Sequence, residues 1–244
     1  IFSPHPDDDI ISMGGTFMRL HDQGHDVNVA YQTSGNIAVT DEFVTRFLDF
    51  AVGFEKIFHI DDTISRKVFE TSSKFLKNKK TTELDSPEIR EIKGLIRRCE
   101  ARATCKYVGL KDDQIHFMNL PFYETGTIEK NPMGQEDIDI TVKLMRKIKP
   151  NQIFCAGDLA DPHGTHKVCL DIILAALAVI KNEKDNKWLD DCYIWLYKGA
   201  WEEWDVSEIE MAVPMSPEQV RKKRYGIFIH QSQKDSVPFQ GSDE

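Results

Sequence analysis

The residues able to do chemistry are concentrated at the start of the chain. The stretch Ser3–Asp9, which reads SPHPDDD, places one imidazole and three carboxylates directly after the apolar pair Ile1-Phe2. The two prolines that flank His5 fix the backbone φ angle and favour extended geometry around the imidazole. Three adjacent carboxylates repel one another unless a positive charge lies among them, and a divalent cation is the simplest candidate.

Helix capping is the alternative explanation for these acids. Asp is a favoured N-cap residue, and acidic side chains in a first helical turn complement the helix dipole. Capping would account for Asp8 or Asp9. It does not account for His5, held between two prolines beside all three acids, so we favour a functional site.

A second polar loop repeats this arrangement about 160 residues later. The stretch Asp161–His166, which reads DPHGTH, follows an apolar segment and precedes an apolar helical pattern. His163 and His166 are three positions apart and would share one face of a helix. Either histidine alone could cap or line a loop, but together with His5 and Asp8 they predict a metal site.

The ligand types favour one class of metal. Imidazole and carboxylate without thiolate suit Zn²⁺, with Fe²⁺ or Mn²⁺ as alternatives, and three protein ligands leave room for water and substrate. A bound zinc ion would bring the pKa of water toward neutrality, while a nearby carboxylate outside the ligand set could take the proton. These parts suit hydrolysis of an amide or ester.

The surrounding pattern indicates how the two loops meet. A strand at residues 1–2, a helix from 10 to 23 closed by Gly24, and a strand within 25–33 form a βαβ unit. Further helices are predicted near 41–54, 64–77, 86–109, 136–149 and 168–180 and from 216 onward, and strands near 114–119, 152–156, 192–197 and 209–213. The polar stretch 77–86 predicts an exposed loop. We therefore expect an α/β fold, a Rossmann-like three-layer sandwich with a mostly parallel sheet, whose carboxyl edge carries both loops and Ser34-Gly35-Asn36.

Composition narrows the class of protein. The 244 residues suit one domain spanning 1–244, with 41% hydrophobic and 29% charged residues, and a net charge of −9 argues against nucleic acid as a partner. No run approaches the roughly 18 apolar residues of a membrane helix. Five irregularly spaced cysteines favour reduced thiols in the cytoplasm. Because the chain begins without Met inside a predicted strand, we expect a fragment of a longer protein.

At its polar loops the sequence resembles the PIG-L/LmbE family of zinc-dependent deacetylases, which act on N-acetylglucosaminyl groups. The matching residues are His5-Pro6-Asp7-Asp8, Gly14-Gly15, Thr33-Ser34-Gly35 and His163-Gly164-Thr165-His166. The resemblance implies His5, Asp8 and His166 as zinc ligands, Asp7 as the general base, and His163 as the group that stabilises the oxyanion. Asp9 stands where the family commonly has Glu.

A tighter resemblance is to a domain attached to a glucosamine-6-phosphate deaminase-like domain in long bacterial polypeptides. It implies a small amino-sugar substrate, N-acetylglucosamine or its 6-phosphate, and an attached deaminase-like domain as partner. The candidate substrate-binding residues are Asn36, Arg97 and Arg98, the candidates for a phosphate contact are Arg46, Arg66 and Arg97, and Tyr123, Trp201 and Trp204 could stack on a sugar or be buried aromatics.

Three other classes of protein compete with this interpretation of the sequence. A dinucleotide-binding domain would need GxGxxG after the first strand, where this chain has PHPDDD. A non-catalytic sugar-binding or regulatory domain would not need a base such as Asp7 beside the metal. A zinc hydrolase of another amide, ester or phosphate remains the enzymatic alternative, because metal chemistry fixes the reaction type better than the substrate.

Overall fold

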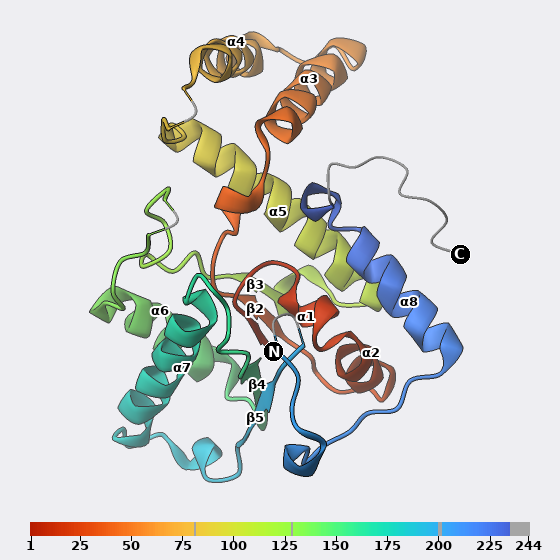
Figure 1. Ribbon diagram of the computed structural model, residues 1–244, viewed down its shortest axis with the longest axis vertical. Helices are drawn as coiled ribbons and strands as arrows, with labels where there is room; N and C mark the ends of the chain where they lie inside the picture. The colour runs from red at the N-terminus through yellow and green to blue at the C-terminus, as the bar shows by residue number, and fades with distance from the viewer. Residues whose placement is uncertain (81, 128, 200–201, 235–244) are drawn as a thin grey trace.

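The computed structural model describes residues 1–80, 82–127, 129–199 and 202–234. Its strands form two parallel ladders (Figure 1). The first ladder joins β1 (Phe2–Ser3), β2 (Val29–Tyr31) and β3 (Ile115–Phe117) in that order, and the second joins β4 (Gln152–Ala156) to β5 (Tyr193–Tyr197).

The two ladders meet between β1 and β4, which lie side by side. Tyr197 Oη donates a hydrogen bond of 2.8 Å to the carbonyl oxygen of Phe2, which ties β5 to β1. The spatial order is therefore β3-β2-β1-β4-β5. The chain leaves β1 toward β2 on one side, while β4 flanks it on the other, so the carboxyl ends of β1 and β4 form a topological switch point.

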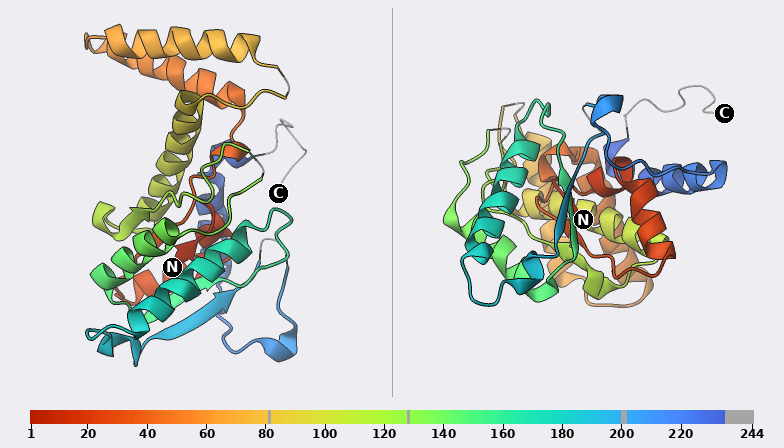
Figure 2. Two further views of the ribbon diagram at one scale, coloured as in Figure 1. Left: turned by 90° about the vertical axis from the view of Figure 1, so that its left-hand side faces the viewer. Right: turned by 90° about the horizontal axis from the view of Figure 1, so that it is seen from below.

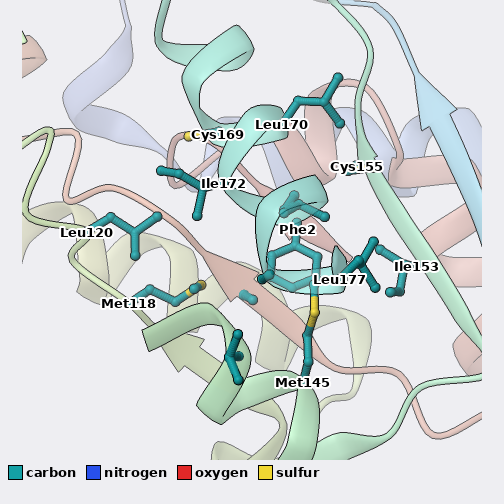
Figure 3. Packing of buried hydrophobic residues seen from close by; sticks show 14 of the residues in the cluster. Phe2, Met118, Leu120, Met145, Ile153, Cys155, Cys169, Leu170, Ile172 and Leu177 are labelled. Atoms are coloured by element: carbon teal, nitrogen blue, oxygen red, sulfur yellow. The ribbon is translucent and has the colours of Figure 1, made fainter. Parts of the chain in front are cut away.

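One face of the sheet is covered by α6 (Gln135–Ile148) and α7 (Thr165–Lys181). Their apolar side chains pack on strand residues in one buried cluster, which includes Phe2, Met145, Ile153 and Leu177 (Figure 3). Because side chains alternate along a strand, the neighbouring strand residues face the opposite layer.

The opposite face is covered by helices that come from both ends of the chain: α1 (Asp8–Ile11), α2 (Gly14–Asp22), α5 (Pro87–Val108) and α8 (Pro217–Phe228). Val29 and Tyr31 of β2 lie in this second cluster with Phe17 and Cys105, whereas Ala30 between them lies in the first. The sheet thus has helices on both faces (Figure 2). The predicted three-layer α/β fold with a parallel sheet is confirmed.

The helices α3 (Asp41–Ile57) and α4 (Thr63–Asn78) form a hairpin that stands away from the sheet (Figures 1 and 2). Val44 and Leu48 of α3 pack with Ile89 of α5 in a small separate cluster, which attaches the hairpin to the rest of the molecule. Short 3₁₀ turns occur at Asn36–Ala38, Asp112–Gln114, Lys187–Leu189, Val206–Glu208 and Gln231–Gln233. None of the helices described is long and apolar enough to cross a membrane.

Most predicted elements are found within a few residues of their expected bounds. The predicted cap of α5 is confirmed, because Ser86 Oγ accepts a hydrogen bond from the backbone N of Ile89. The first predicted helix is instead two, α1 and α2, which meet near Ser12 and Met13.

One further expectation was wrong and another was confirmed in part. Residues 209–213 form no strand: the segment follows the 3₁₀ turn Val206–Glu208 and lies beside β5 with Ile209 and Met211 exposed, without strand pairing among the described residues. Most described residues of the stretch 77–86 are exposed as predicted, but Lys79 is half-buried and pairs with Asp41 and Asp85.

Candidate metal centre

The loop after β1 is folded by its own hydrogen bonds. Ser3 Oγ donates to the carbonyl oxygen of His5 at 2.5 Å and accepts from the backbone N of Asp9 at 3.1 Å. Asp8 Oδ2 accepts from the backbone N of His5 at 2.9 Å. These contacts close the loop over the end of β1 and bring the Asp8 carboxylate beside the His5 ring.

The Asp161 carboxylate holds the end of the loop after β4. Asp161 Oδ2 accepts from the backbone N atoms of Thr165 and His166, at 2.8 and 3.2 Å, and so caps the start of α7. His166 Nδ1 lies 3.1 Å from the carbonyl oxygen of Asp158. A proton on Nδ1 would complete that hydrogen bond and leave Nε2 as the coordinating atom, the usual arrangement for a metal-binding histidine.

The two loops bring three ligand atoms into a nearly equilateral triangle. His5 Nδ1, Asp8 Oδ2 and His166 Nε2 are each 3.3 Å from the other two. A tetrahedral zinc ion bound at about 2.0–2.1 Å would separate its ligand atoms by about 3.3 Å. The residues therefore fit a zinc-sized cation at the switch point of the sheet.

The electrostatics of this triangle favour a bound positive charge. Burial alone would raise the pKa of Asp8, but hydrogen bonds from His166 and His5, and their charge, outweigh it and hold that pKa well below its usual range. Burial would lower the pKa of His166, but Asp8 raises it above its ordinary value. The carboxylate thus requires a cationic partner, which a proton or a metal ion could supply.

Asp7 stands outside the triangle and faces a different partner. Its Oδ1 lies 3.1 Å from Nη2 of Arg97, a guanidinium of α5 whose side chain is only 2% exposed. Burial raises the pKa of Asp7, the charge of Arg97 lowers it and that of Asp8 raises it, with a net increase. Arg97 therefore fixes the orientation of a carboxylate that adjoins the metal ligands without joining them.

The approach of Arg97 depends on Gly35, whose φ of 62° lies in the left-handed region. A Cβ atom at this position would lie 2.9 Å from Pro6 Cδ and 3.1 Å from Arg97 Cζ. Glycine therefore allows the loop after β2, the loop after β1 and α5 to meet at one point.

These groups open into a cavity of about 400 Å³. His163 lies at its edge with its side chain half exposed, and its Nδ1 is 3.2 Å from Asp161 Oδ1. Tyr123 forms another wall, with its ring edge-on to the His5 ring at a centroid distance of 6.0 Å. The cavity can therefore present a substrate to the triangle, to Asp7 and to His163 at once.

Residues 1–177 match the family model for PIG-L, described as GlcNAc-PI de-N-acetylase. The chain belongs to the PIG-L family. It is 57% identical over its whole length to a glucosamine-6-phosphate deaminase-like protein of Bacteroides thetaiotaomicron, and it spans 37% of that longer protein. The predicted family resemblance is confirmed, and membership supports hydrolytic deacetylation.

Solved structures establish the fold of this PIG-L chain. N,N'-diacetylchitobiose deacetylase from Pyrococcus horikoshii has a TM-score of 0.60 at 19% identity, over 96% of this chain and 70% of that one. The conserved protein TT1542 from Thermus thermophilus has a TM-score of 0.50 at 14% identity, over 95% of this chain and 77% of that one.

The predicted substrate residues are divided between two cavities of the PIG-L chain. Arg97 lines the cavity of about 400 Å³ beside the ligand triangle, called the metal cavity from here on. Asn36 and Arg98 line a neighbouring cavity of about 180 Å³. Asn36 Nδ2 donates to Glu124 Oε2 at 3.1 Å, and Arg98 lies 3.7 Å from a carboxylate oxygen of Glu91. The adjacent residues Arg97 and Arg98 of α5 therefore line different cavities.

Several other candidates lie away from the metal cavity. Arg46 and Arg66 belong to the α3–α4 hairpin, where Arg66 pairs with Asp62. Trp204 lies against Lys198 beside β5, and Trp201 is outside the described residues. Among the three aromatic candidates that leaves Tyr123 in the wall of the metal cavity.

Asp9, the residue that replaces the family's Glu, turns into the protein core. It accepts a hydrogen bond from Tyr31 Oη at 2.9 Å. Burial raises the pKa of Asp9 to about 7, with Tyr31 opposing the shift and Asp7 and Asp8 adding to it. Asp9 therefore stabilises the packing beneath the loop.

Sequence reasoning missed two polar residues of the cavity, Lys130 and Gln233. Gln233 reaches the cavity because the neighbouring Ser232 donates from its backbone N and its Oγ to Glu100, at 2.8 and 2.6 Å. No motif surrounds either residue, so only the folded chain reveals their position. Glu100 of α5 thus holds the segment around Ser232 in place.

Proposed function

We propose that this PIG-L chain is a metal-dependent hydrolase that removes the N-acetyl group from an N-acetylglucosamine-containing substrate. The observation that carries the proposal is the 3.3 Å triangle of His5, Asp8 and His166 with the Asp7–Arg97 pair beside it. The family description, GlcNAc-PI de-N-acetylase, supports the substrate class. So does the name of the Pyrococcus structure, a deacetylase of an N-acetylated disaccharide.

The chemistry is divided between the metal and the side chains. A zinc ion held by the triangle would lower the pKa of water and polarise the amide carbonyl. Asp7 accepts the proton of the attacking water and later delivers it to the departing nitrogen, so water and amide become acetate and amine. His163 donates a hydrogen bond to the oxyanion of the tetrahedral intermediate. Arg97 keeps Asp7 oriented throughout.

We also propose an attached domain and a cellular location for this reaction. The similarity to part of a deaminase-like protein supports an attached deaminase-like domain, which would act on the amino sugar that deacetylation releases. The five cysteines are free thiols, which supports a cytoplasmic location.

An amine-release assay tests the proposed reaction. Protein purified without added metal is assayed on N-acetylglucosamine and its 6-phosphate, before and after chelation and again after zinc, iron(II) or manganese is restored. We expect amine release that chelator abolishes and one of the metals restores. Bound metal without release from any N-acetyl sugar would favour a sugar-binding domain or a hydrolase of another amide or ester.

A further inference from the structure

One cation in the metal cavity lacks the carboxylate partner that such groups usually have. Lys130 Nζ donates to the carbonyl oxygen of Thr127 at 2.7 Å and lies 3.8 Å from the centre of the Tyr123 ring. The charge of Glu124 acts on Lys130, while the two Glu124 carboxylate oxygens accept from Ser34 N and Asn36 Nδ2. Within the described ranges no carboxylate forms an ion pair with Lys130. Arg97, the other cation of the cavity, is paired with Asp7.

The position of Lys130 relative to the metal ligands is set by Tyr123. The centre of the Tyr123 ring lies 6.0 Å from the centre of the His5 ring and 3.8 Å from Lys130 Nζ. The ammonium is therefore no farther from the His5 ring than those two distances taken together, a separation that one monosaccharide with its substituents can bridge. A sugar whose acetamide group reached the triangle could therefore place a substituent on its far side against the ammonium.

The environment of Lys130 makes the ammonium receptive to an anion. Its side chain is half-buried. Burial lowers the pKa of Lys130 to about 8, and the charge of Glu124 only partly opposes that effect. A desolvated cation without a counter-ion is destabilised, and a bound anion removes that penalty. Thr127 and the face of Tyr123 meanwhile hold the ammonium in place, which reduces the entropy lost on binding.

We propose that Lys130 selects amino sugars that carry a phosphate monoester on the N-acetylated ring, by binding the phosphate beside the Tyr123 ring in the cavity that His5, Asp7 and Asp8 also line. The inference rests on the proposed function, because it places the acetamide at the metal triangle. It also replaces Arg46 and Arg66 as candidates for the phosphate contact, since both lie on the α3–α4 hairpin. A phosphate carries between one and two negative charges near neutral pH and accepts several hydrogen bonds, which suits the three donors of an ammonium.

Binding of the product tests the inference without requiring turnover. Isothermal titration of the zinc-loaded protein would compare glucosamine 6-phosphate with glucosamine in wild type, Lys130→Met and Lys130→Arg. We expect wild type to bind the phosphorylated sugar about tenfold to a hundredfold more tightly, the range of one charged contact. Lys130→Met should bring that ratio close to one, and Lys130→Arg should retain most of it.

A matched control and a folding control accompany these variants. Lys143→Met makes the same change at an exposed position of α6 and should leave the ratio at its wild-type value. All variants should retain one metal ion per chain. A wild-type ratio near one, or a ratio that survives Lys130→Met, would overturn the inference.

Kinetics on N-acetylglucosamine and its 6-phosphate separate this inference from the proposed function. Amine release without preference for the phosphorylated sugar would contradict the role of Lys130 and leave deacetylation standing. Absence of amine release from both sugars, with the Lys130-dependent binding ratio intact, would contradict deacetylation and leave Lys130 as an anion-binding residue.

Discussion

The metal centre and the α3–α4 hairpin differ in the contacts that their side chains make. At the centre, polar side chains of the loops after β1 and β4 and of α5 contact one another or backbone N atoms at 2.8–3.3 Å. The hairpin instead exposes apolar side chains: Phe50 is 67% exposed, Ile57 72% and Ile64 79%. The candidate site therefore depends on contacts between distant parts of the chain, whereas the hairpin packs on the body mainly through α5 in the described part of the chain.

Removing a ligand should have the largest effect. His166→Ala deletes one corner of the triangle and leaves Asp8 buried beside a single imidazole. We expect metal binding to be lost and amine release to fall by at least about a thousandfold, the several kcal/mol that a catalytic metal supplies. Metal analysis and the amine-release assay measure both. A variant that keeps its metal and its activity would remove His166 from the ligand set.

Asp7→Asn should separate catalysis from metal binding. The amide has nearly the same shape and lies outside the triangle, so one metal ion per chain should remain. Because the amide cannot accept the proton of water, turnover should fall by about 10²–10⁴-fold. Undiminished turnover would exclude Asp7 as the base.

Arg97→Met should have an intermediate effect. It removes the partner of Asp7 from a site where the guanidinium is almost fully buried. We expect kcat to fall about tenfold to a hundredfold, since a buried group left unpaired costs about 1–3 kcal/mol. The metal content should not change. Arg97→Lys should recover part of kcat, and a loss of metal in Arg97→Met would show that Arg97 supports the ligands instead.

A change on the hairpin should matter least. Phe50→Ser replaces an exposed side chain of α3, where substitutions usually change the free energy of unfolding by no more than about 0.5 kcal/mol. Amine release should stay within about twofold of wild type. A tenfold loss of kcat/KM, with metal content intact, would show that the hairpin is coupled to the centre. The two regions would then not be independent.

The sequence predicted two polar loops that follow strands, and short-range contacts fold both of them in the structure. Asp8 reaches the His5 backbone three positions away, and Asp161 caps the helix that begins four positions later. Such contacts follow from local residue order. The convergence of the two loops followed from the expected parallel sheet, which the structure confirms.

Contacts between distant segments were beyond sequence reasoning. Arg97 and Arg98 are adjacent, and the sequence does not show which of them faces the site. The orientation of α5 beside Gly35 places Arg97 next to Asp7. Lys130 has no motif around it. The apolar residues at 209–213 suggested a strand, but the segment has no strand partner among the described residues, and only the folded chain shows this. The catalytic and ligand roles of the individual residues stay predictions.

Metal titration into the metal-free protein tests the central claim most directly. Zinc is added in steps to chelator-treated protein while amine release from an N-acetylated glucosamine is followed. The triangle predicts that activity rises in proportion to zinc and stops rising at one equivalent per chain, and that Asp7→Asn binds the same single equivalent without gaining comparable activity. Full amine release from the metal-free protein, or binding of zinc with no gain in activity on any N-acetylated sugar, would contradict the account.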